Sequence, residues 1–500
     1  MATLLSQGMS ASLMAPGAGR EAAIPIGSRL ELMVDDFLIE RLEGGARQVL
    51  HHPIPREVVL VHDAPWEGSG CNYYSVFCDG DLYRMYYHGW QLGSPKGAAD
   101  TPHPLVTCYA ESRDGIHWEK PSLGLVEYEG SRANNIVLAT GELDGVPICA
   151  GHIALCKDEN PDAAPEARYK ALAVSWELKG LIALGSPDGF HWRPLSKEPV
   201  ITKGAFDSQN LAFWDSARGE YRAYVRFFDG GCRGILTATS PDFLHWTEPL
   251  PLEYPGTPKE QLYTNQVKPY HRAPHLLLGF PTRYVERGWS PSMEALPELE
   301  HRRLRSRACD RYGMALTEGL FMSSRDGRTF RRWGEAFLRP GPERPDTWNY
   351  GHQYIAWHPV ETAASLPGAA NELSLYATES YWTGTYTLLR RYTLRLDGFV
   401  SVNAPLSGGA VLTKPIRFEG SRLWLNFSTS AAGAVRVEIQ DASGAPIPGF
   451  ALADCHETFG DSIERPVVWK RGSDVSALAG RAVRLRFELS DADLYAFRFR

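Results

Sequence analysis

The sequence predicts an all-β protein in which a five-bladed β-propeller over residues 28–403 precedes a C-terminal β-sandwich over residues 404–500. Three observations lead to this prediction. A short turn signature recurs along the chain, each copy follows the same order of strand-like segments, and the C-terminal segment alternates apolar and polar residues between Gly-, Asp- and Ser-rich turns. The 47 Gly and 35 Pro among 500 residues favour many turns over long helices.

The N-terminal segment divides into two parts. Residues 1–27 are small and polar to apolar, and they lack both the basic start and the continuous apolar run of a secretory signal, so a flexible tail is predicted. Residues 28–66 are expected to supply a strand that closes the ring of blades.

The turn signature is the clearest repeat in the chain. It reads SRDGIHW at residues 112–118, SPDGFHW at 186–192 and SPDFLHW at 240–246, with a looser copy, SRDGRTF, at 324–330 and a degenerate one, LDGF, at 396–399. Asp-Gly forms tight turns because Gly tolerates positive φ and Asp bonds the local backbone. The Trp that follows would anchor the outgoing strand in the core.

Each signature follows strand-like segments in a constant order. In the first unit these are residues 73–77, 82–88 and 106–110, and in the third unit residues 211–214, 221–227 and 234–238. Four strands per repeat is the pattern of a propeller blade. The blades are therefore expected near residues 68–130, 150–200, 206–250, 262–335 and 349–403.

Two regions depart from the repeat. Residues 290–308 have a Pro near the start of a helix-like segment and predict a helical insertion in blade four, either a solvated one or a lid or oligomer contact. After Ser401, segments such as residues 423–427, 435–439 and 483–487 predict the β-sandwich, which would brace the propeller or bind glycan.

The composition argues against several classes of partner. The formal net charge is −7 and no polybasic stretch occurs, which argues against a nucleic-acid surface. No run of about 18 apolar residues is present, so no membrane span is predicted. The eight cysteines are scattered without a CxxC pair or a Cys/His cluster at zinc spacing. We therefore expect reduced thiols and a cytoplasmic location. No cofactor is predicted.

The central channel is the expected ligand site, because its wall comes from the innermost strand of each blade. The residues that open these strands are rich in amides, aromatic rings and histidine. Such groups bond sugar hydroxyls and stack on sugar faces, so a carbohydrate ligand is predicted. The alternative is that these polar groups only satisfy the backbone at strand ends. The predicted substrate-binding residues are Asn72, Tyr73, His152, Gln209, Asn210, Asn265, Gln266, Trp348, Tyr350 and His352.

S-x-D-G-x-x-W turns in a five-bladed propeller with a C-terminal sandwich resemble the clan of glycoside hydrolases that contains invertases, levanases, arabinanases and β-xylosidases, families 32 and 43 among them. The resemblance covers most of the chain and implies two or three carboxylates at the starts of inner strands. Asp207, in the segment FDSQ, stands where the invertase-like enzymes have Arg-Asp-Pro, so the resemblance implies a transition-state stabiliser there. Glu260 falls where their acid would lie.

The first-blade carboxylate that the resemblance implies is not matched. It would align near residues 71–72, where no carboxylate stands. Glu67, Asp36 and Glu379 are the candidate substitutes, and Asp36, together with Asp35, can equally cap a turn.

Two arginines and two histidines complete the predicted channel. Arg226 and Arg283 stand in strand-like segments, where either could hold a substrate acid or tune Asp207, or could form a structural ion pair between blades. His152 and His352 could both reach a central ion. Lone histidines are more often hydrogen-bonded core residues, so no metal ligand is assigned.

The function predicted first is a glycoside hydrolase that acts on an oligosaccharide or a glycan terminus. Asp207 would be the stabiliser or base, and Glu260 or Glu379 the acid. Three alternatives stay open: a non-catalytic carbohydrate-binding propeller, a phosphorylase or other sugar-transforming enzyme on the same frame, and an interaction scaffold, because the propeller fold alone implies no chemistry.

Overall fold

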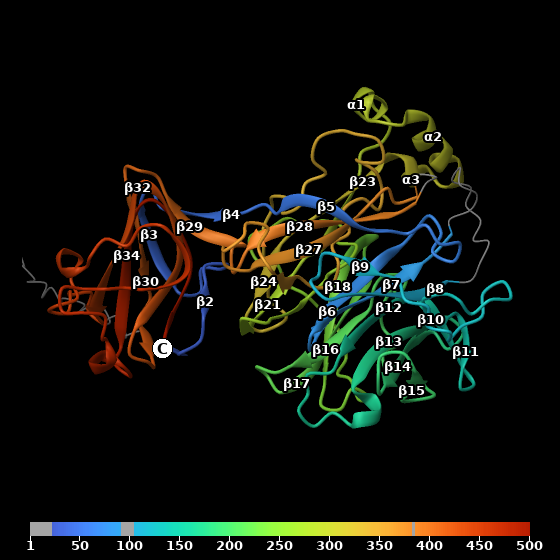
Figure 1. Ribbon diagram of the computed structural model, residues 1–500, viewed down its shortest axis with the longest axis horizontal. Coiled ribbons are helices and arrows are strands. Elements are labelled where there is room, and N and C mark those ends of the chain that lie inside the picture. Colours follow the sequence, from blue (N-terminus) through green and yellow to red (C-terminus); the bar gives the residue numbers. More distant parts are fainter. Residues whose placement is uncertain (1–22, 92–104, 383–385) are drawn as a thin grey trace, which may run out of the picture.

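A computed structural model of the chain describes residues 23–91, 105–382 and 386–500. It shows a five-bladed β-propeller beside a second, smaller β unit that is built mainly from the C-terminal residues (Figure 1). The all-β propeller predicted from the sequence is therefore confirmed. Residues 1–22 of the predicted tail lie outside the described residues.

The five blades are antiparallel sheets that follow one another along the chain. Blade one holds β6 (Asn72–Asp79), β7 (Leu82–Gly89), β8 (Val106–Ser112), β9 (Trp118–Glu119) and β10 (Ile136–Ala139). Blade two holds β11 (Gly141–Leu143), β12 (Val146–Lys157), β13 (Tyr169–Ser175), β14 (Gly180–Ser186) and β15 (Arg193–Pro194), with a 3-10 turn at Pro165–Ala167. Blade three holds β16 (Leu211–Asp215), β17 (Glu220–Asp229), β18 (Cys232–Ser240) and β19 (Leu250–Pro251).

The last two blades carry additions to the repeat. Blade four holds β20 (Lys268–Tyr270), β21 (Ala273–Gly279), β24 (Met322–Ser324) and β25 (Arg331–Arg332), and the hairpin of β22 (Thr282–Glu286) and β23 (Ala315–Gly319) extends from it. Blade five holds β26 (Val360–Thr362), β27 (Glu372–Glu379), β28 (Leu388–Arg395) and β5 (Ile54–Val61).

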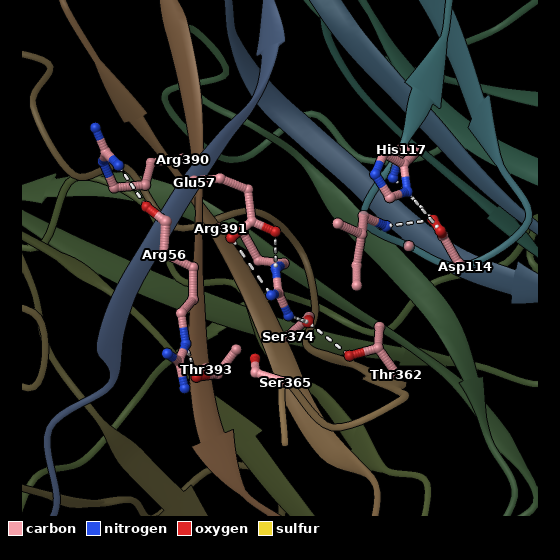
Figure 2. Close-up of polar contacts among 12 residues, drawn as sticks. Arg56, Glu57, Asp114, His117, Thr362, Ser365, Ser374, Arg390, Arg391 and Thr393 are labelled. Carbon is pink, nitrogen blue, oxygen red and sulfur yellow. Dashed lines mark hydrogen bonds and ion pairs between the residues drawn. The ribbon is translucent and has the colours of Figure 1, made fainter. Parts of the chain in front are cut away.

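The strand β5 closes the ring, because it comes from the N-terminal part of the chain and pairs antiparallel with β28. Side chains reinforce this pairing: Arg56 donates from Nε to the Thr393 hydroxyl at 2.9 Å, and Arg391 donates from Nε to Glu57 at 3.0 Å (Figure 2). Arg391 also reaches Ser374 on the next strand at 3.1 Å. The closing strand is thus fixed by ion pairs as well as by the sheet.

The turn signatures are built as the sequence predicts. Asp114 accepts the backbone N–H groups of Ile116 and His117, both at 2.8 Å, and its second oxygen lies 2.7 Å from His117 Nδ1 (Figure 2). Trp118 Nε1 then donates to the Gly115 carbonyl at 3.2 Å, which sets the outgoing strand. The copies at residues 186–192 and 240–246 repeat these bonds.

Carboxylates that are hydrogen-bonded or ion-paired in the folded state, such as Asp188 of the second turn signature and Glu31, make the stability of the protein sensitive to acid. Burial opposes the shift, but the N–H groups of His191 and Phe190 lower the pKa of Asp188 to about 2, from 3.8. For the buried Glu31, a bond to His275 and the charge of Arg325 outweigh burial and lower its pKa to about 2, from 4.5. A carboxyl whose pKa is depressed by folding stabilises the folded state above its unfolded pKa and loses that contribution as the pH falls.

We therefore expect the thermal midpoint to fall steeply between about pH 4 and pH 2, the window set by these two pKa shifts. Asp188→Asn should lower the midpoint at pH 7 and flatten its fall in acid, because the variant no longer has this carboxyl to protonate. Differential scanning fluorimetry at half-unit pH steps measures both. An unchanged acid profile in the variant would contradict the assignment to Asp188.

The smaller unit draws its strands from both ends of the chain, so the propeller boundary differs from residues 28–403. The N-terminal strands β1 to β4 pair within this unit rather than with the propeller. Its strands are β1 (Ile24–Gly27), β2 (Glu31–Leu32), β3 (Ile39–Gly44), β4 (Arg47–Leu50), β29 (Val400–Ala404), β30 (Gly409–Thr413), β31 (Ile416–Phe418), β32 (Leu423–Asp441), β33 (Asp461–Pro466) and β34 (Val483–Phe499), with 3-10 turns at Leu452–Asp454 and Ser476–Leu478.

Hydrogen bonding joins these strands into one ten-stranded sheet. The long strands β32 and β34 pair along their lengths, with an irregularity between Thr429 and Ala434. Alternate apolar side chains of both strands, among them Phe427, Val437 and Phe487, are fully buried in one core. The sheet therefore folds over its own apolar face and encloses that core.

Three short helices lie between β22 and β23: α1 (Pro291–Ala295), α2 (Leu299–Ala308) and α3 (Asp310–Met314). The single helix predicted over residues 290–308 is interrupted where the chain passes Pro297, which cannot continue a helix. One face of the insertion packs on the propeller, because Arg302 and Arg305 are buried and donate to the carbonyls of Thr347 and Tyr350, each at 3.0 Å. The other face, with Glu294 and Arg303, is exposed.

None of the helices within the described ranges is long and apolar enough to cross a membrane. All eight cysteines are free thiols.

Candidate functional site

The starts of the inner strands gather at one end of the channel. Parallel bridges join Ser75 to Trp357 and Ile153 to Asn210, so the inner strands of neighbouring blades run in the same direction. The second strand of each blade is antiparallel to the first, and its C-terminal end therefore lies beside the start of the inner strand. The side chains that meet there, called the channel-mouth cluster below, are Tyr73, His88, Trp90, His152, Trp176, Asp207, Arg226, Phe228, Arg233, Tyr263, Tyr284, Arg311, Tyr312, Tyr350, Tyr354, Tyr381 and Trp382.

Aromatic rings form most of this cluster. The Tyr73 ring stacks on Tyr354 with centroids 6.4 Å apart and an interplanar angle of 13°, and Tyr354 lies 5.4 Å from Tyr263. The Tyr350 hydroxyl donates to the Tyr263 hydroxyl at 2.9 Å. All five blades contribute, so the cluster exists only when the ring is closed.

Several inner strands begin with a residue in the left-handed region of the backbone. Tyr73, Gln266 and Gln353 have φ angles of 53°, 48° and 63°. Such residues cost free energy and persist where the surrounding structure holds them, most often at functional sites.

Asp207 is the predicted catalytic residue that the structure places in the cluster. Its side chain is 60% exposed and forms an ion pair with Arg226, whose own side chain is only 2% exposed. The flanking residues anchor it: Phe206 is buried, and Ser208 donates its hydroxyl to the Tyr263 carbonyl at 2.9 Å. An accessible carboxylate on a fixed backbone beside a buried cation is suited to stabilising positive charge on a substrate.

Tyr263 and His152 have shifted pKa values. Burial alone would raise the pKa of Tyr263, but the charge of Arg226, the hydrogen bond from Tyr350 and the charges of Arg233 and Arg311 outweigh it and lower that pKa. Burial, aided by Arg226, lowers the pKa of His152 to about 4, so this imidazole is neutral at pH 7.

Most of the predicted amide ligands bond protein groups instead. Gln209 donates to the Tyr73 carbonyl at 2.9 Å and accepts from Gln266 at 2.8 Å, and Gln266 also donates to the Ile355 carbonyl at 2.9 Å. Asn210 donates to the Phe206 and Ser208 carbonyls. These side chains hold the inner strands of different blades together across the channel, which is the alternative that the sequence left open.

The two remaining predicted amides are also buried at strand ends. Asn265 accepts from the Val267 N–H at 3.3 Å. Asn72 is buried at the start of β6, opposite His88, and its Oδ1 has no hydrogen-bond partner among the described residues.

Gln209→Ala should therefore lower the free energy of unfolding by about 2–4 kcal/mol, because it empties a buried site and leaves strand-end groups unpaired. Urea unfolding followed by tryptophan fluorescence measures the loss. Unchanged stability combined with weaker sugar binding would instead assign Gln209 to the ligand.

Glu260 and Arg283 belong to a charge network apart from Asp207. Arg283 lies 3.0 Å from Glu260 and 2.5 Å from Glu318, and Arg332, on the outer strand β25, forms a further ion pair with Glu260. The network holds Glu260 between two arginines, one of them on the outer strand β25, and none of these contacts reaches Asp207.

Glu379 lies at the end of β27, in a separate cavity of about 620 Å³. It is ion-paired with Arg344 and Arg390 and accepts from the Tyr392 hydroxyl at 3.2 Å. Burial opposes the shift, but Arg390 and Arg344 lower the pKa of Glu379. Among the described residues, the cavity lining includes none of the channel-mouth cluster.

The other two candidate carboxylates, Asp36 and Glu67, are not part of the channel-mouth cluster. Asp36 falls between β2 and β3 of the smaller unit, while its neighbour Asp35 pairs with Arg325 at 2.6 Å. Glu67 is buried and accepts from the Tyr87 hydroxyl at 2.6 Å and from Lys120 at 2.9 Å. None of these contacts links either residue to Asp207.

Trp348 and His352 lie in the loop before the inner strand of blade five. Trp348 donates from Nε1 to the Gly341 carbonyl at 2.8 Å, and its backbone N–H donates to His352 Nδ1 at 3.1 Å. His352 is fully buried, and burial lowers its pKa to about 4. Of the three substrate-binding residues predicted in this loop, Trp348, Tyr350 and His352, Tyr350 is the one that belongs to the channel-mouth cluster. Within the described residues no group of three or more His, Cys, Asp or Glu side chains is arranged to hold a metal ion.

Sequence reasoning missed much of the cluster, chiefly at the ends of second strands. His88 lies near the end of β7 and Trp90 directly follows it, Phe228 lies near the end of β17, and Tyr381 follows β27. A rule that inspects the last residues of each second strand, together with the first residues of each inner strand, would have found them, because antiparallel pairing places the two side by side.

Comparisons with known proteins give partial likenesses. No family model matches the chain. An uncharacterised protein of Mycobacterium tuberculosis, Rv1502, is 45% identical over 150 residues, which is 29% of this chain and 39% of that protein. The chain thus spans about two fifths of the length of this relative.

Two solved structures are similar across most of this chain. One is a glycoside hydrolase family 43 arabinoxylan arabinofuranohydrolase from Bacillus subtilis, with a TM-score of 0.38 and 11% identity, covering 87% of this chain and 96% of its own. The other is an N-acetylgalactosamine deacetylase from F. plautii, with a TM-score of 0.37 and 12% identity, covering 88% of this chain and 95% of its own.

Proposed function

We propose that the protein is a glycoside hydrolase that acts on an oligosaccharide or glycan terminus at the channel-mouth cluster. One observation carries the proposal: Asp207 presents an exposed carboxylate, held by the buried Arg226, within a ring of aromatic side chains from all five blades. Aromatic faces stack on sugar rings, and a fixed carboxylate stabilises the positive charge that develops when a glycosidic bond breaks.

The cluster supplies a second ionisable group in Tyr263. Its oxygen accepts a hydrogen bond from Tyr350, and the guanidinium groups of Arg226 and Arg233 lie 5.2 Å from its ring centroid. These surroundings lower the pKa of Tyr263. In the proposed step its oxygen bonds to the anomeric carbon as the glycosidic C–O bond breaks, and the phenol proton passes through water to the leaving oxygen while Asp207 stabilises the sugar cation. Water then hydrolyses the tyrosine–sugar bond and returns the proton to Tyr263. Glycosidases with a tyrosine in the role of the nucleophile are an established exception to the two-carboxylate arrangement.

Non-catalytic glycan binding is the second candidate. It is favoured by the positions of Glu260 and Glu379, because both carboxylates are held by arginines outside the cluster. The two candidates differ in whether a bond is broken, which makes them separable by one assay.

The test is product release from a broad panel of oligosaccharides and aryl glycosides, followed by chromatography, with wild-type and Asp207→Asn proteins purified in parallel. The proposal expects products with the wild type that disappear with the variant. Sugar binding without any product would favour the non-catalytic candidate. Equal product release by both proteins would show either a contaminating hydrolase or a reaction elsewhere in the chain, and would overturn the assignment to Asp207.

A further inference from the structure

We propose that the sugar bound at the channel-mouth cluster carries an oxyanion, the carboxylate of a uronic acid or a sulfate ester, held by Arg226, Arg233 and Arg311. The inference rests on the proposed carbohydrate ligand, but not on its hydrolysis.

Three guanidinium groups lie against the rings of two hydrogen-bonded tyrosines, Tyr263 and Tyr350. The Arg226 and Arg233 guanidinium carbons both lie 5.2 Å from the Tyr263 ring centroid, and they also share the Phe228 ring at 5.0 and 5.4 Å. Two like charges thus lie against the same two rings.

Arg311 approaches from the helical insertion. Its guanidinium carbon lies 4.6 Å from the Tyr312 ring and 5.7 Å from the Tyr350 ring, and Tyr350 donates its hydroxyl to Tyr263. The insertion therefore adds a third cation beside the hydrogen-bonded pair of Tyr350 and Tyr263.

Carboxylates in this region do not balance the three cations. Arg226 pairs with Asp207, while Arg233 and Arg311 form no ion pair with the described residues. Arg233 donates to the Gln261 amide oxygen at 2.5 Å. Glu286 stands two residues after Tyr284 and accepts a hydrogen bond from the Tyr284 hydroxyl at 2.7 Å.

The guanidinium groups also keep spare donors. Nε of Arg226, Nε of Arg233 and Nη1 of Arg311 have no hydrogen-bond acceptor among the described residues, although these atoms are buried. A buried N–H without an acceptor costs free energy, and like charges in a poorly hydrated site repel each other. A bound oxyanion would remove both costs, because a guanidinium fork matches the geometry of carboxylate and sulfate oxygens.

A sugar fits this cluster better than a bare anion. Trp176 and Phe228 leave 51% and 47% of their surfaces exposed, and they can stack on an apolar sugar face. The neutral His152 and the exposed Asp207 can bond hydroxyl groups. The ligand therefore needs both a ring with hydroxyls and a negative group.

The test compares acidic and neutral sugars of the same size and linkage by isothermal titration calorimetry: galacturonate and glucuronate oligosaccharides, 6-O-sulfated galactose oligosaccharides, and their neutral galactose and glucose counterparts. We expect one acidic class to bind at least about tenfold more tightly than its neutral counterpart, the carboxylate and sulfate arms showing which oxyanion is preferred. Arg233→Gln and Arg311→Gln should each remove most of that preference, so that the acidic sugar binds little more tightly than its neutral counterpart.

Arg193→Gln is the matched control, because Arg193 is an exposed arginine on the outer strand β15 and its loss changes the net charge equally. It should keep the full preference for acidic sugars. Equal affinity for acidic and neutral sugars, or no binding of any acidic sugar, would overturn the inference. Tight binding of an acidic sugar without product release would uphold it while the hydrolase proposal fails.

Discussion

Asp207→Asn is expected to lower kcat by about 10³-fold while the Kd for substrate changes little. Asparagine keeps the size of the side chain and one acceptor oxygen but removes the negative charge that is needed only when the sugar becomes a cation. Because Asp207 is largely exposed and its flanking residues anchor the backbone, the fold should survive the substitution. Steady-state kinetics and calorimetric titration on the same preparation separate the two quantities.

Asp229→Asn serves as the matched control for Asp207. Asp229 ends β17, the strand that carries Arg226, and like Asp207 it is an exposed carboxylate paired with a cation, here Lys259 at 2.5 Å. Its neutralisation should leave kcat unchanged. A value for Asp207→Asn within threefold of the wild type would remove Asp207 from the reaction, and an equal loss in both variants would point to a general electrostatic effect.

Asp397→Ala is expected to destabilise the protein by about 3–4 kcal/mol, the largest loss that a single exchange should cause at the junction of the two units. Asp397 stands in the degenerate turn signature and is fully buried. It accepts from the Tyr270 hydroxyl at 2.8 Å, from Arg272 at 2.9 Å and from the Asn426 amide at 2.9 Å. Its removal leaves a buried hydroxyl and amide without their acceptor.

This carboxylate joins blade four to strand β32 of the smaller unit, so its loss should also weaken their coupling. Urea unfolding followed by far-ultraviolet circular dichroism is expected to change from one transition to two. Asp397→Asn, which keeps one acceptor oxygen, should lose about half as much stability. Asp144→Ala controls for the backbone, since Asp144 also has positive φ but lies exposed in a turn. A single transition at the wild-type midpoint in Asp397→Ala would contradict the proposed role.

The architecture could be predicted from the sequence because the turns that define it are built by interactions between residues close together in the chain. The Asp-Gly turns could be recognised because every bond that builds them, such as those of Asp114 to Ile116 and His117, joins residues a few positions apart. Strand order and blade spacing followed from the same short-range pattern. The position of Asp207 at the opening of an inner strand could also be predicted, because the repeat sets the order of the strands.

Contacts between distant residues needed the tertiary structure. Gln209 and Gln266 looked like ligands of a sugar, yet they bond each other and the backbone of other blades, because the inner strands converge so closely that their amides meet. The N-terminal strands β1 to β4 pair with the C-terminal sheet for a similar reason: their partners lie hundreds of positions away, and no local signal marks them.

The sequence by itself thus determined the repeat, the turns and the class of fold, all of which depend on interactions within a few residues or on strand periodicity. Only the tertiary structure decided which charged side chains share a site. Glu260 and Glu379 form ion pairs with arginines outside the cluster. Arg233 and Arg311, in contrast, lie with Arg226 beside Tyr263 and its hydrogen-bonded neighbour Tyr350. The partner of a charged side chain is set by the closure of the ring and the packing of the insertion, and both bring together residues that the chain keeps far apart.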